Sequence, residues 1–221
     1  MTQYRQTYGR NPQVMVMQNH GLVVSAVSAA AALRLVKKTV AVFADKQSKP
    51  KPVSVKTTEF ELLKKAQSAI RQAVFKAGGG YITVRCCTDA SVQSFISRPD
   101  CKALCGGGSL TPDEACVAHG GPLWVEHPDT VKLAGQLEKV KRAGKPLPTG
   151  FAVKGVGLLT AALAKEAAFV EEFLRSYIKV RQDAAKSGGL RFIPAALAAL
   201  YAESKKQPAP RGVLSRRLAI V

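Results

Sequence analysis

Two spacings of apolar residues alternate along this chain, and they predict both strands and helices. Short apolar runs bounded by turn residues are typical of strands, and they occupy residues 14–17, 81–84, 92–96 and 151–153. Apolar residues three or four positions apart predict helices, which span about 28–44, 58–77, 129–142, 161–185 and 193–201. Because strands and helices alternate, we expect an α/β fold in which helices cover both faces of a mixed sheet.

Polar residues and glycine at the predicted helix ends support these boundaries. Ser28 and Asp129 are typical N-cap residues, because their side-chain oxygens accept hydrogen bonds from backbone amides of the first turn. Gly78 follows the second helix, where glycine readily adopts the left-handed conformation that ends a helix. The basic, proline-containing segment 48–52 predicts a stiff linker between the first two helices.

The charge of the chain is strongly positive, with 33 Lys and Arg against 15 Asp and Glu and a formal net charge of +18. Such an excess favours polyanionic partners, which include nucleic acid, phosphorylated metabolites and acidic membrane surfaces. Aromatic residues are not interleaved with the basic clusters along the sequence, as a platform that stacks on bases requires. Nucleic acid is therefore a possible partner, but the sequence does not favour it.

The cysteines and the longest apolar run indicate where the protein resides. Five cysteines, two of them adjacent at 86–87, make a poor disulfide framework and suit a reducing compartment. The longest nearly apolar run, residues 22–33, is shorter than the roughly 20 residues of a membrane-spanning helix. We therefore expect a cytoplasmic protein with no membrane partner.

The apolar run Val14–Met17 ends at a motif that points to chemistry, Asn19-His20-Gly21. His20 would lie at the C-terminal end of a buried strand, where ligands bind in α/β folds. Neutral imidazole is also the commonest metal ligand in proteins. The alternative is a histidine that only completes a tight turn.

The stretch VMVMQNHGLVVSA around His20 resembles the third-histidine motif of the class II aldolase/adducin family. The segments SLTPDEACVAHGGPLWVE and FAVKGVGLL are similar to segments of bifunctional rhamnulose-1-phosphate aldolase/alcohol dehydrogenase proteins, in the same order. The resemblance implies a partial α/β/α sandwich and a divalent metal, usually zinc, bound by His20. It also implies a homo-oligomer that cleaves a ketose phosphate such as rhamnulose 1-phosphate in a retro-aldol reaction.

The chain also departs from that family. The family's His-x-His pair and acid/base glutamate precede the third histidine, and residues 1–18 contain no His, Asp or Glu. Glu114 stands where the family usually has a histidine after LTPD. The resemblance thus implies that residues 1–203 form an aldolase-like domain without its N-terminal part, inactive as this chain alone. Residues 204–221 would be a basic linker that leads into a truncated Rossmann-like first strand.

Two other interpretations use only residues that are present. The chain could be a non-catalytic basic scaffold protein on an aldolase/adducin-like fold, and its charge would then bind polyanions. Alternatively, Cys101-x3-Cys105 and Cys116-x2-His119 have spacings close to those of structural zinc sites. These four residues are candidate zinc ligands that do not require His20.

Overall fold

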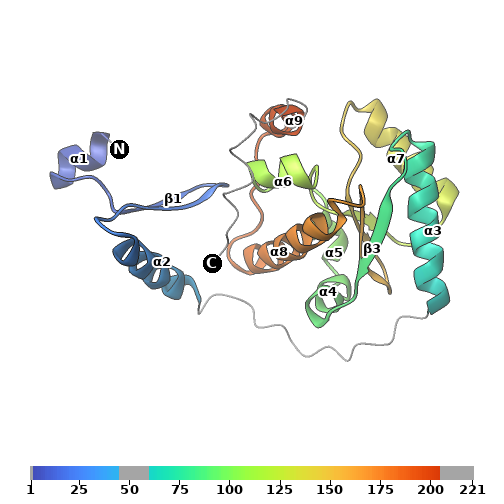
Figure 1. Ribbon diagram of the computed structural model, residues 1–221, viewed down its shortest axis with the longest axis horizontal. Coiled ribbons are helices and arrows are strands. Elements are labelled where there is room, and N and C mark those ends of the chain that lie inside the picture. The colour runs from blue at the N-terminus through green and yellow to red at the C-terminus, as the bar shows by residue number, and fades with distance from the viewer. Residues whose placement is uncertain (1, 45–59, 205–221) are drawn as a thin grey trace. The chain divides into compact units, whose positions relative to one another are not determined.

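The structure, a computed structural model, describes residues 2–44 and 60–204 (Figure 1). The chain divides into two compact units, Met1–Lys49 and Pro50–Val221. The predicted linker at 48–52 lies outside the described residues, as does the predicted basic linker and Rossmann-like strand from residue 205 onward.

The described part of the first unit consists of a short helix, a β-hairpin and a longer helix. Its elements are α1 (Thr2–Tyr8), β1 (Val14–Met17), β2 (Gly21–Val24) and α2 (Ala29–Ala44). The two strands are antiparallel, with Met17 opposite Gly21, so a tight turn joins them. The predicted cap of α2 is confirmed, because Ser28 Oγ accepts a hydrogen bond from the Ala31 amide at 3.3 Å.

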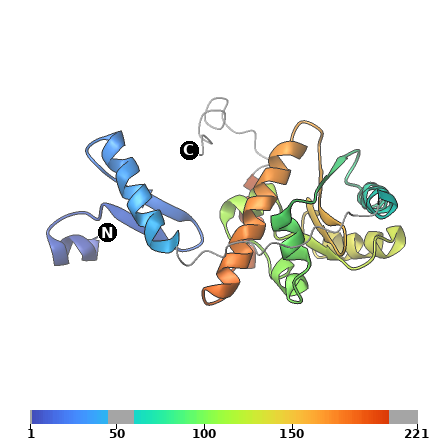
Figure 2. The ribbon, with the colours of Figure 1, turned by 90° about the horizontal axis from the view of Figure 1, so that it is seen from below.

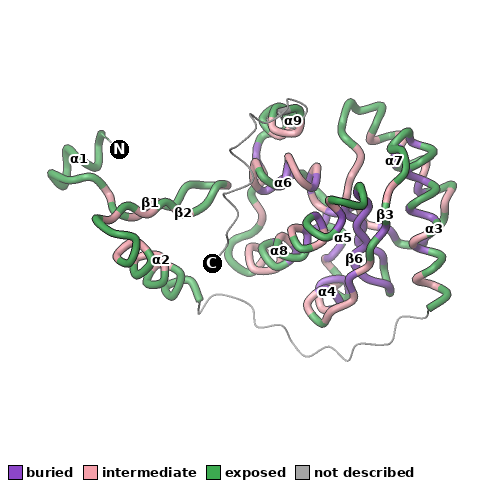
Figure 3. Tube along the Cα trace, in the orientation of Figure 1, coloured by how far each residue is buried: buried purple, intermediate pink, exposed green. Residues whose placement is uncertain are grey.

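None of residues 2–44 is buried, as the green and pink trace in Figure 3 shows. The strand predicted at Val14–Met17 is confirmed, but the prediction that it is buried is wrong, because it pairs only with the neighbouring strand β2. Leu33, Val40 and Phe43, on the predicted apolar face of α2, are exposed. The described part of this unit therefore does not enclose a core of its own.

The second unit is a mixed four-stranded sheet with helices on both faces, which confirms the predicted α/β class. Its strands are β3 (Thr83–Cys87), β4 (Leu123–Val125), β5 (Gly150–Val153) and β6 (Gly157–Ala162). Its helices are α3 (Phe60–Lys76), α4 (Ala90–Ile96), α5 (Cys101–Cys105), α6 (Pro112–Val117), α7 (Thr130–Arg142), α8 (Ala167–Lys186) and α9 (Ala195–Ser204). The strand order is β3-β6-β5-β4, and only the β4–β5 pair is parallel.

Side chains of the central strands alternate between two cores, one on each face of the sheet. Phe151 and Leu159 join the core that the sheet makes with α3 and α7. Ala152 and Leu158 join the core that it makes with α4, α5 and α8. Figure 2 shows these layers, with α8 and α3 on opposite sides of the strands. Because β5 and β6 are covered on both faces, every residue in them is buried.

Two predicted elements are wrong. Residues 92–96, predicted as a strand, lie in helix α4, which Asp89 caps by accepting a hydrogen bond from the Val92 amide. The helix predicted from about residue 161 begins at Ala167, because residues 157–162 form the central strand β6. Leucine and alanine in this segment favour a helix locally, but pairing with β3 and β5 fixes it as a strand.

A fully buried ion pair joins α8 to the first turn of α6, and its hydrogen bonds extend to the irregular segment that precedes α6. Arg181 Nη2 lies 2.8 Å from Glu114 Oε1, and it also donates to Gly108 O at 2.9 Å. Arg181 Nη1 donates to Leu104 O at 2.8 Å, and the Leu110 amide donates to Glu114 Oε2 at 2.5 Å. The pair therefore fixes the chain from the end of α5 to the start of α6 against α8.

The surroundings of this pair are tightly packed. Burial raises the pKa of the Glu114 carboxyl, whereas the Arg181 guanidinium and the Leu110 amide favour its ionised form. Gly121 allows the backbone to pass close by, since a Cβ atom there would lie 2.7 Å from Arg181 Nη2. Any larger residue at position 121 would displace the guanidinium.

Replacing Arg181 by Met should lower the free energy of unfolding by about 3–5 kcal/mol, because it strands a buried carboxylate and removes donors from two carbonyls. Urea unfolding followed by circular dichroism measures the change. Lys186→Met, at an exposed position of the same helix, is the matched control and should change stability by less than about 0.5 kcal/mol. A loss below about 1 kcal/mol in Arg181→Met would show that the pair does not anchor α8.

Candidate functional site

Helices α3 and α7, on one face of the sheet, present the strongest accumulation of charge among the described residues. We define the basic layer as the exposed cations of these helices and the loop after α7: Lys64, Lys65, Arg71, Lys76, Lys132, Lys139, Lys141, Arg142 and Lys145. The carboxylates of the same segments are Glu61 and Glu138. Nine cations beside two anions produce a strong positive field at this face.

The packing of α3 against α7 explains why these cations face outward. Ala66 and Ile70 of α3 and Leu133 and Leu137 of α7 are buried in one core with the sheet. The helices lie side by side, and Lys141 Nζ donates to Ala77 O at 3.2 Å across their C-terminal ends. Both last turns are basic, which complements the negative ends of the helix dipoles.

The opposite helix layer is different, because several of its cations lie close to carboxylates, whereas the described ion pair of the basic layer is that of Lys64 with Glu61, 3.8 Å apart. Arg175 lies 2.5 Å from Asp89, and Lys179 lies 3.0 Å from Asp183. Arg85 of the edge strand β3 lies 2.8 Å from Glu171. These exposed pairs neutralise charge without adding much stability. The positive field is therefore concentrated on the face that carries α3 and α7.

Aromatic side chains accompany the cations of α3, which corrects the expectation that aromatic and basic residues are not interleaved. Phe60 is 64% exposed, and Lys64 Nζ lies 4.1 Å from the centre of its ring. Phe75 and Tyr81 form a pair of rings with centroids 5.3 Å apart. The sequence did not reveal this pair because a glycine turn brings Tyr81 back to the helix.

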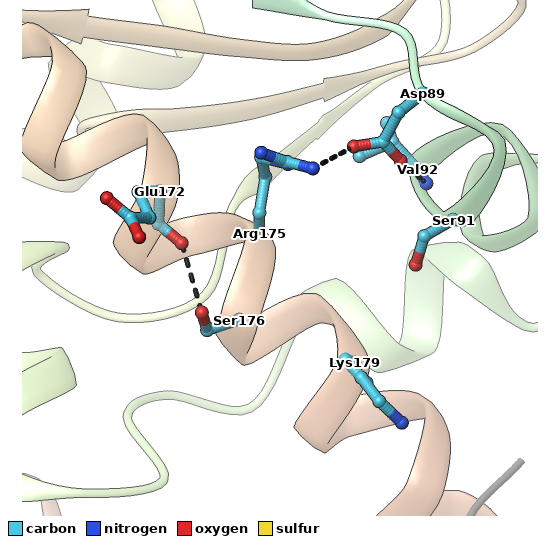
Figure 4. Close-up of a pocket in the computed structure, with 7 residues that line it drawn as sticks. All are labelled: Asp89, Ser91, Val92, Glu172, Arg175, Ser176 and Lys179. Atoms are coloured by element: carbon cyan, nitrogen blue, oxygen red, sulfur yellow. Dashed lines mark hydrogen bonds and ion pairs between the residues drawn. The ribbon is translucent and has the colours of Figure 1, made fainter. Parts of the chain in front are cut away.

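A shallow pocket of about 290 Å³ lies between α4 and α8 on the other face (Figure 4). Its residues come from segments far apart in the chain: Asp89, Ser91, Val92, Glu172, Arg175, Ser176 and Lys179. Figure 4 shows Arg175 pointing towards Asp89, while the Ser176 hydroxyl bonds to the Glu172 carbonyl. The cations and anions of the pocket balance, so it offers no concentrated charge to a ligand.

Asp89 has the most perturbed carboxyl of this pocket. Its partial burial opposes ionisation, but the Val92 amide, the Cys87 thiol and Arg175 outweigh that effect and hold its pKa below the usual range. Asp89 is therefore ionised at neutral pH and a weak general base. Its contacts explain its role as the cap of α4 and the partner of Arg175.

His20 lies in the turn between β1 and β2 and is exposed. Its neighbour Asn19 has a φ of 57°, and Gly21 has a φ of 143°, so both residues use backbone conformations suited to a tight turn. The ring is accessible to solvent. Among the described residues, no group of three or more His, Cys, Asp or Glu side chains could hold a metal ion.

The four candidate zinc ligands of residues 101–119 do not form a metal site. Cys101 and Cys105 are buried on α5 with their sulfur atoms 4.0 Å apart. Cys116 donates to Tyr201 O at 3.1 Å, and His119 Nδ1 lies 2.8 Å from Leu147 O. The structure thus directs these side chains to different partners. The hydrogen bond with the Cys105 thiol, followed by burial, raises the pKa of Cys101, which makes it unreactive.

Cys86 and Cys87 are also poor nucleophiles. Burial raises the pKa of Cys86 to about 12 and also raises the pKa of Cys87. All five cysteines are free thiols. The thiolate is the reactive form, so these two residues stay protonated at neutral pH and do not act as nucleophiles.

Comparisons of the chain with protein-family models, with curated proteins and with solved structures found no match. The resemblance to the class II aldolase/adducin family therefore stays a prediction. Within residues 2–44 and 60–204, no helix is long and apolar enough to cross a bilayer.

Asp89→Asn should make the protein less sensitive to acid. The folded pKa of Asp89 is below its unfolded value, so its stabilising effect is present above the unfolded pKa and is lost as the pH falls through the folded pKa. The stability advantage of the wild type over Asp89→Asn should therefore shrink between about pH 5 and pH 2. Urea unfolding at several pH values measures this difference, and Glu172→Gln is the matched control. A difference that stays constant with pH would contradict the prediction.

Proposed function

We propose that this chain is a non-catalytic, basic α/β protein that binds polyanions through the basic layer. The observation that carries the proposal is the segregation of charge, with unbalanced cations on α3 and α7 and paired cations around α8. A face of one sign attracts polyanions at long range and gains affinity by releasing their counterions.

The chemistry of the other candidate residues supports a binding role over catalysis. Asp89 is held ionised, Cys86 and Cys87 are held protonated, and Glu114 is sequestered in a buried ion pair. A general base or nucleophile works best when its pKa lies near the operating pH and its reactive atom is accessible. The cations of the basic layer, in contrast, are exposed and need no pKa shift to bind phosphate or sulfate groups.

Full-length protein should bind heparin and duplex DNA with an affinity that falls steeply as salt rises. The triple variant Lys132→Gln, Lys139→Gln, Arg142→Gln should reduce the slope of log K against log salt by up to about 0.9 for each lost phosphate contact. Fluorescence anisotropy over a salt series measures both quantities.

The matched control replaces three exposed lysines outside the basic layer, Lys102, Lys165 and Lys186, by Gln. This control removes three positive charges, as the first triple variant does. A difference between the two variants therefore reports where the charge lies and not how much charge the protein carries. Equal losses in the two triple variants, or no binding to either polyanion at low salt, would contradict the proposal.

A second candidate function is favoured by the exposure of His20. We propose that His20 is one ligand of a catalytic zinc in a class II aldolase-like lyase that cleaves ketose phosphates. Catalytic zinc normally has three protein ligands, so the remaining ligands would be supplied by residues that this chain does not contain. The accessible ring at the β1–β2 turn is compatible with such shared coordination.

If His20 binds zinc, adding a polypeptide that carries the family's His-x-His pair should let the full chain retain the metal, and His20→Ala should lose it. The change should alter stability by less than about 0.5 kcal/mol, because His20 is exposed. Metal analysis and urea unfolding measure the two effects. His127→Ala, at another exposed histidine, is the control, and equal zinc contents in all three proteins would exclude the ligand role.

A further inference from the structure

We infer that α3 and Tyr81 form a stacking platform for single-stranded nucleic acid. We define the α3 stripe as Phe60, Lys64, Arg71 and Phe75. This inference rests on the proposed binding of polyanions and names the polyanion that this surface fits. Its basis is the alternation of exposed aromatic rings and cations along one side of a helix.

Helix geometry places the four residues of the α3 stripe on one face. At about 100° per residue, Phe60, Lys64, Arg71 and Phe75 fall within about 60° of one another around the helix axis. At 1.5 Å per residue, the stripe is about 22 Å long. The buried residues of α3 lie on the opposite side: Ala66, Ala69, Ile70, Ala73 and Val74. The stripe therefore faces away from the sheet.

A glycine turn adds Tyr81 to the end of this stripe. Gly79 N donates to Val74 O and Gly78 N to Phe75 O, both at 2.9 Å, which is the Schellman pattern that ends a helix. Gly78 has a φ of 82°, in the left-handed region that this turn requires. The chain then reverses, and the Tyr81 ring lies 5.3 Å from the Phe75 ring at 44°.

The rings of this stripe remain available to a ligand. Phe60 is 64%, Phe75 51% and Tyr81 88% exposed. An exposed aromatic ring keeps apolar surface in contact with water. Stacking on an unpaired base would remove that surface from water, which is favourable. Arg71, one turn before Phe75, and the adjacent Lys76 place positive charge beside the rings, where the phosphates of a stacked strand would pass.

The composition of this surface favours a single strand over the other polyanions. A duplex keeps its bases stacked inside, so it could use only the cations. An interfacial membrane helix needs a continuous apolar face, whereas the exposed side of α3 also carries Ser68 and Gln72. A single strand can contact both features, because its unpaired bases stack on the rings and its phosphates contact the cations.

The test compares binding of a labelled single-stranded oligonucleotide of about 20 nucleotides with binding of a duplex of the same sequence. Wild-type protein should prefer the single strand. The double variant Phe75→Ala, Tyr81→Ala should weaken single-strand binding at least about fivefold and leave duplex binding unchanged. Phe75→Leu keeps an apolar side chain of similar size, and it should also weaken single-strand binding if stacking is responsible.

Phe169→Ala is the matched control, because Phe169 is a 45% exposed ring on α8 that pairs with Phe173. It should leave single-strand binding unchanged. Circular dichroism and urea unfolding verify that each variant is folded as the wild type is.

Each other outcome overturns the inference. Equal affinity for single strand and duplex in the wild type, or equal losses for both in the aromatic variants, would leave polyanion binding intact but exclude base stacking. Binding to vesicles that contain phosphatidylserine, without single-strand binding, would assign the stripe to acidic lipid. No binding to heparin, duplex or single strand would remove both this inference and the proposed function.

Discussion

The buried ion pair between Arg181 and Glu114 is the constraint on which the second unit depends. Removing two charges from water is costly, so such a pair is tolerated only when its remaining hydrogen bonds are nearly all satisfied. The carbonyls of Leu104 and Gly108 and the Leu110 amide supply those bonds, and they fix a segment that has little regular structure. Arg181 Nε remains without a hydrogen bond among the described residues, so the network is nearly complete. Helix α8 is thereby anchored on one face of the sheet.

The other face of the sheet is covered by α7, which packs through Leu133 and Leu137, and by α3, which packs mainly through small residues. The buried side of α3 is mostly alanine, which lets the helix approach the sheet closely and keeps long side chains on its outer side. The same constraint separates the charges. Arg175 finds Asp89 across the α4–α8 pocket and Lys179 finds Asp183 one turn further along α8, whereas α3, α7 and the loop after α7 carry nine exposed cations beside two carboxylates. The candidate binding face is therefore a consequence of how the two cores are built.

Sequence patterns predicted the features of this fold that depend on local chemistry. Ser28 and Asp129 cap their helices and Gly78 ends α3, since each needs only a few neighbouring residues. Features set by distant partners were not predictable. The leucine and alanine residues of strand β6 favour a helix locally, and the Phe75–Tyr81 pair depends on the geometry of a turn. Likewise, no pattern links Arg181 to Glu114, which lie 67 positions apart in the sequence.

The basic layer also has an energetic consequence. Like charges held close together repel one another and oppose the compact state. The C-terminal ends of α3 and α7 offset part of this repulsion, because the helix dipoles favour cations there. A polyanion bound across the layer would remove the rest, and it would stabilise the folded chain in proportion to its preference for the folded over the unfolded form. Binding of a polyanion and stability of the fold would thus be coupled through the same nine side chains.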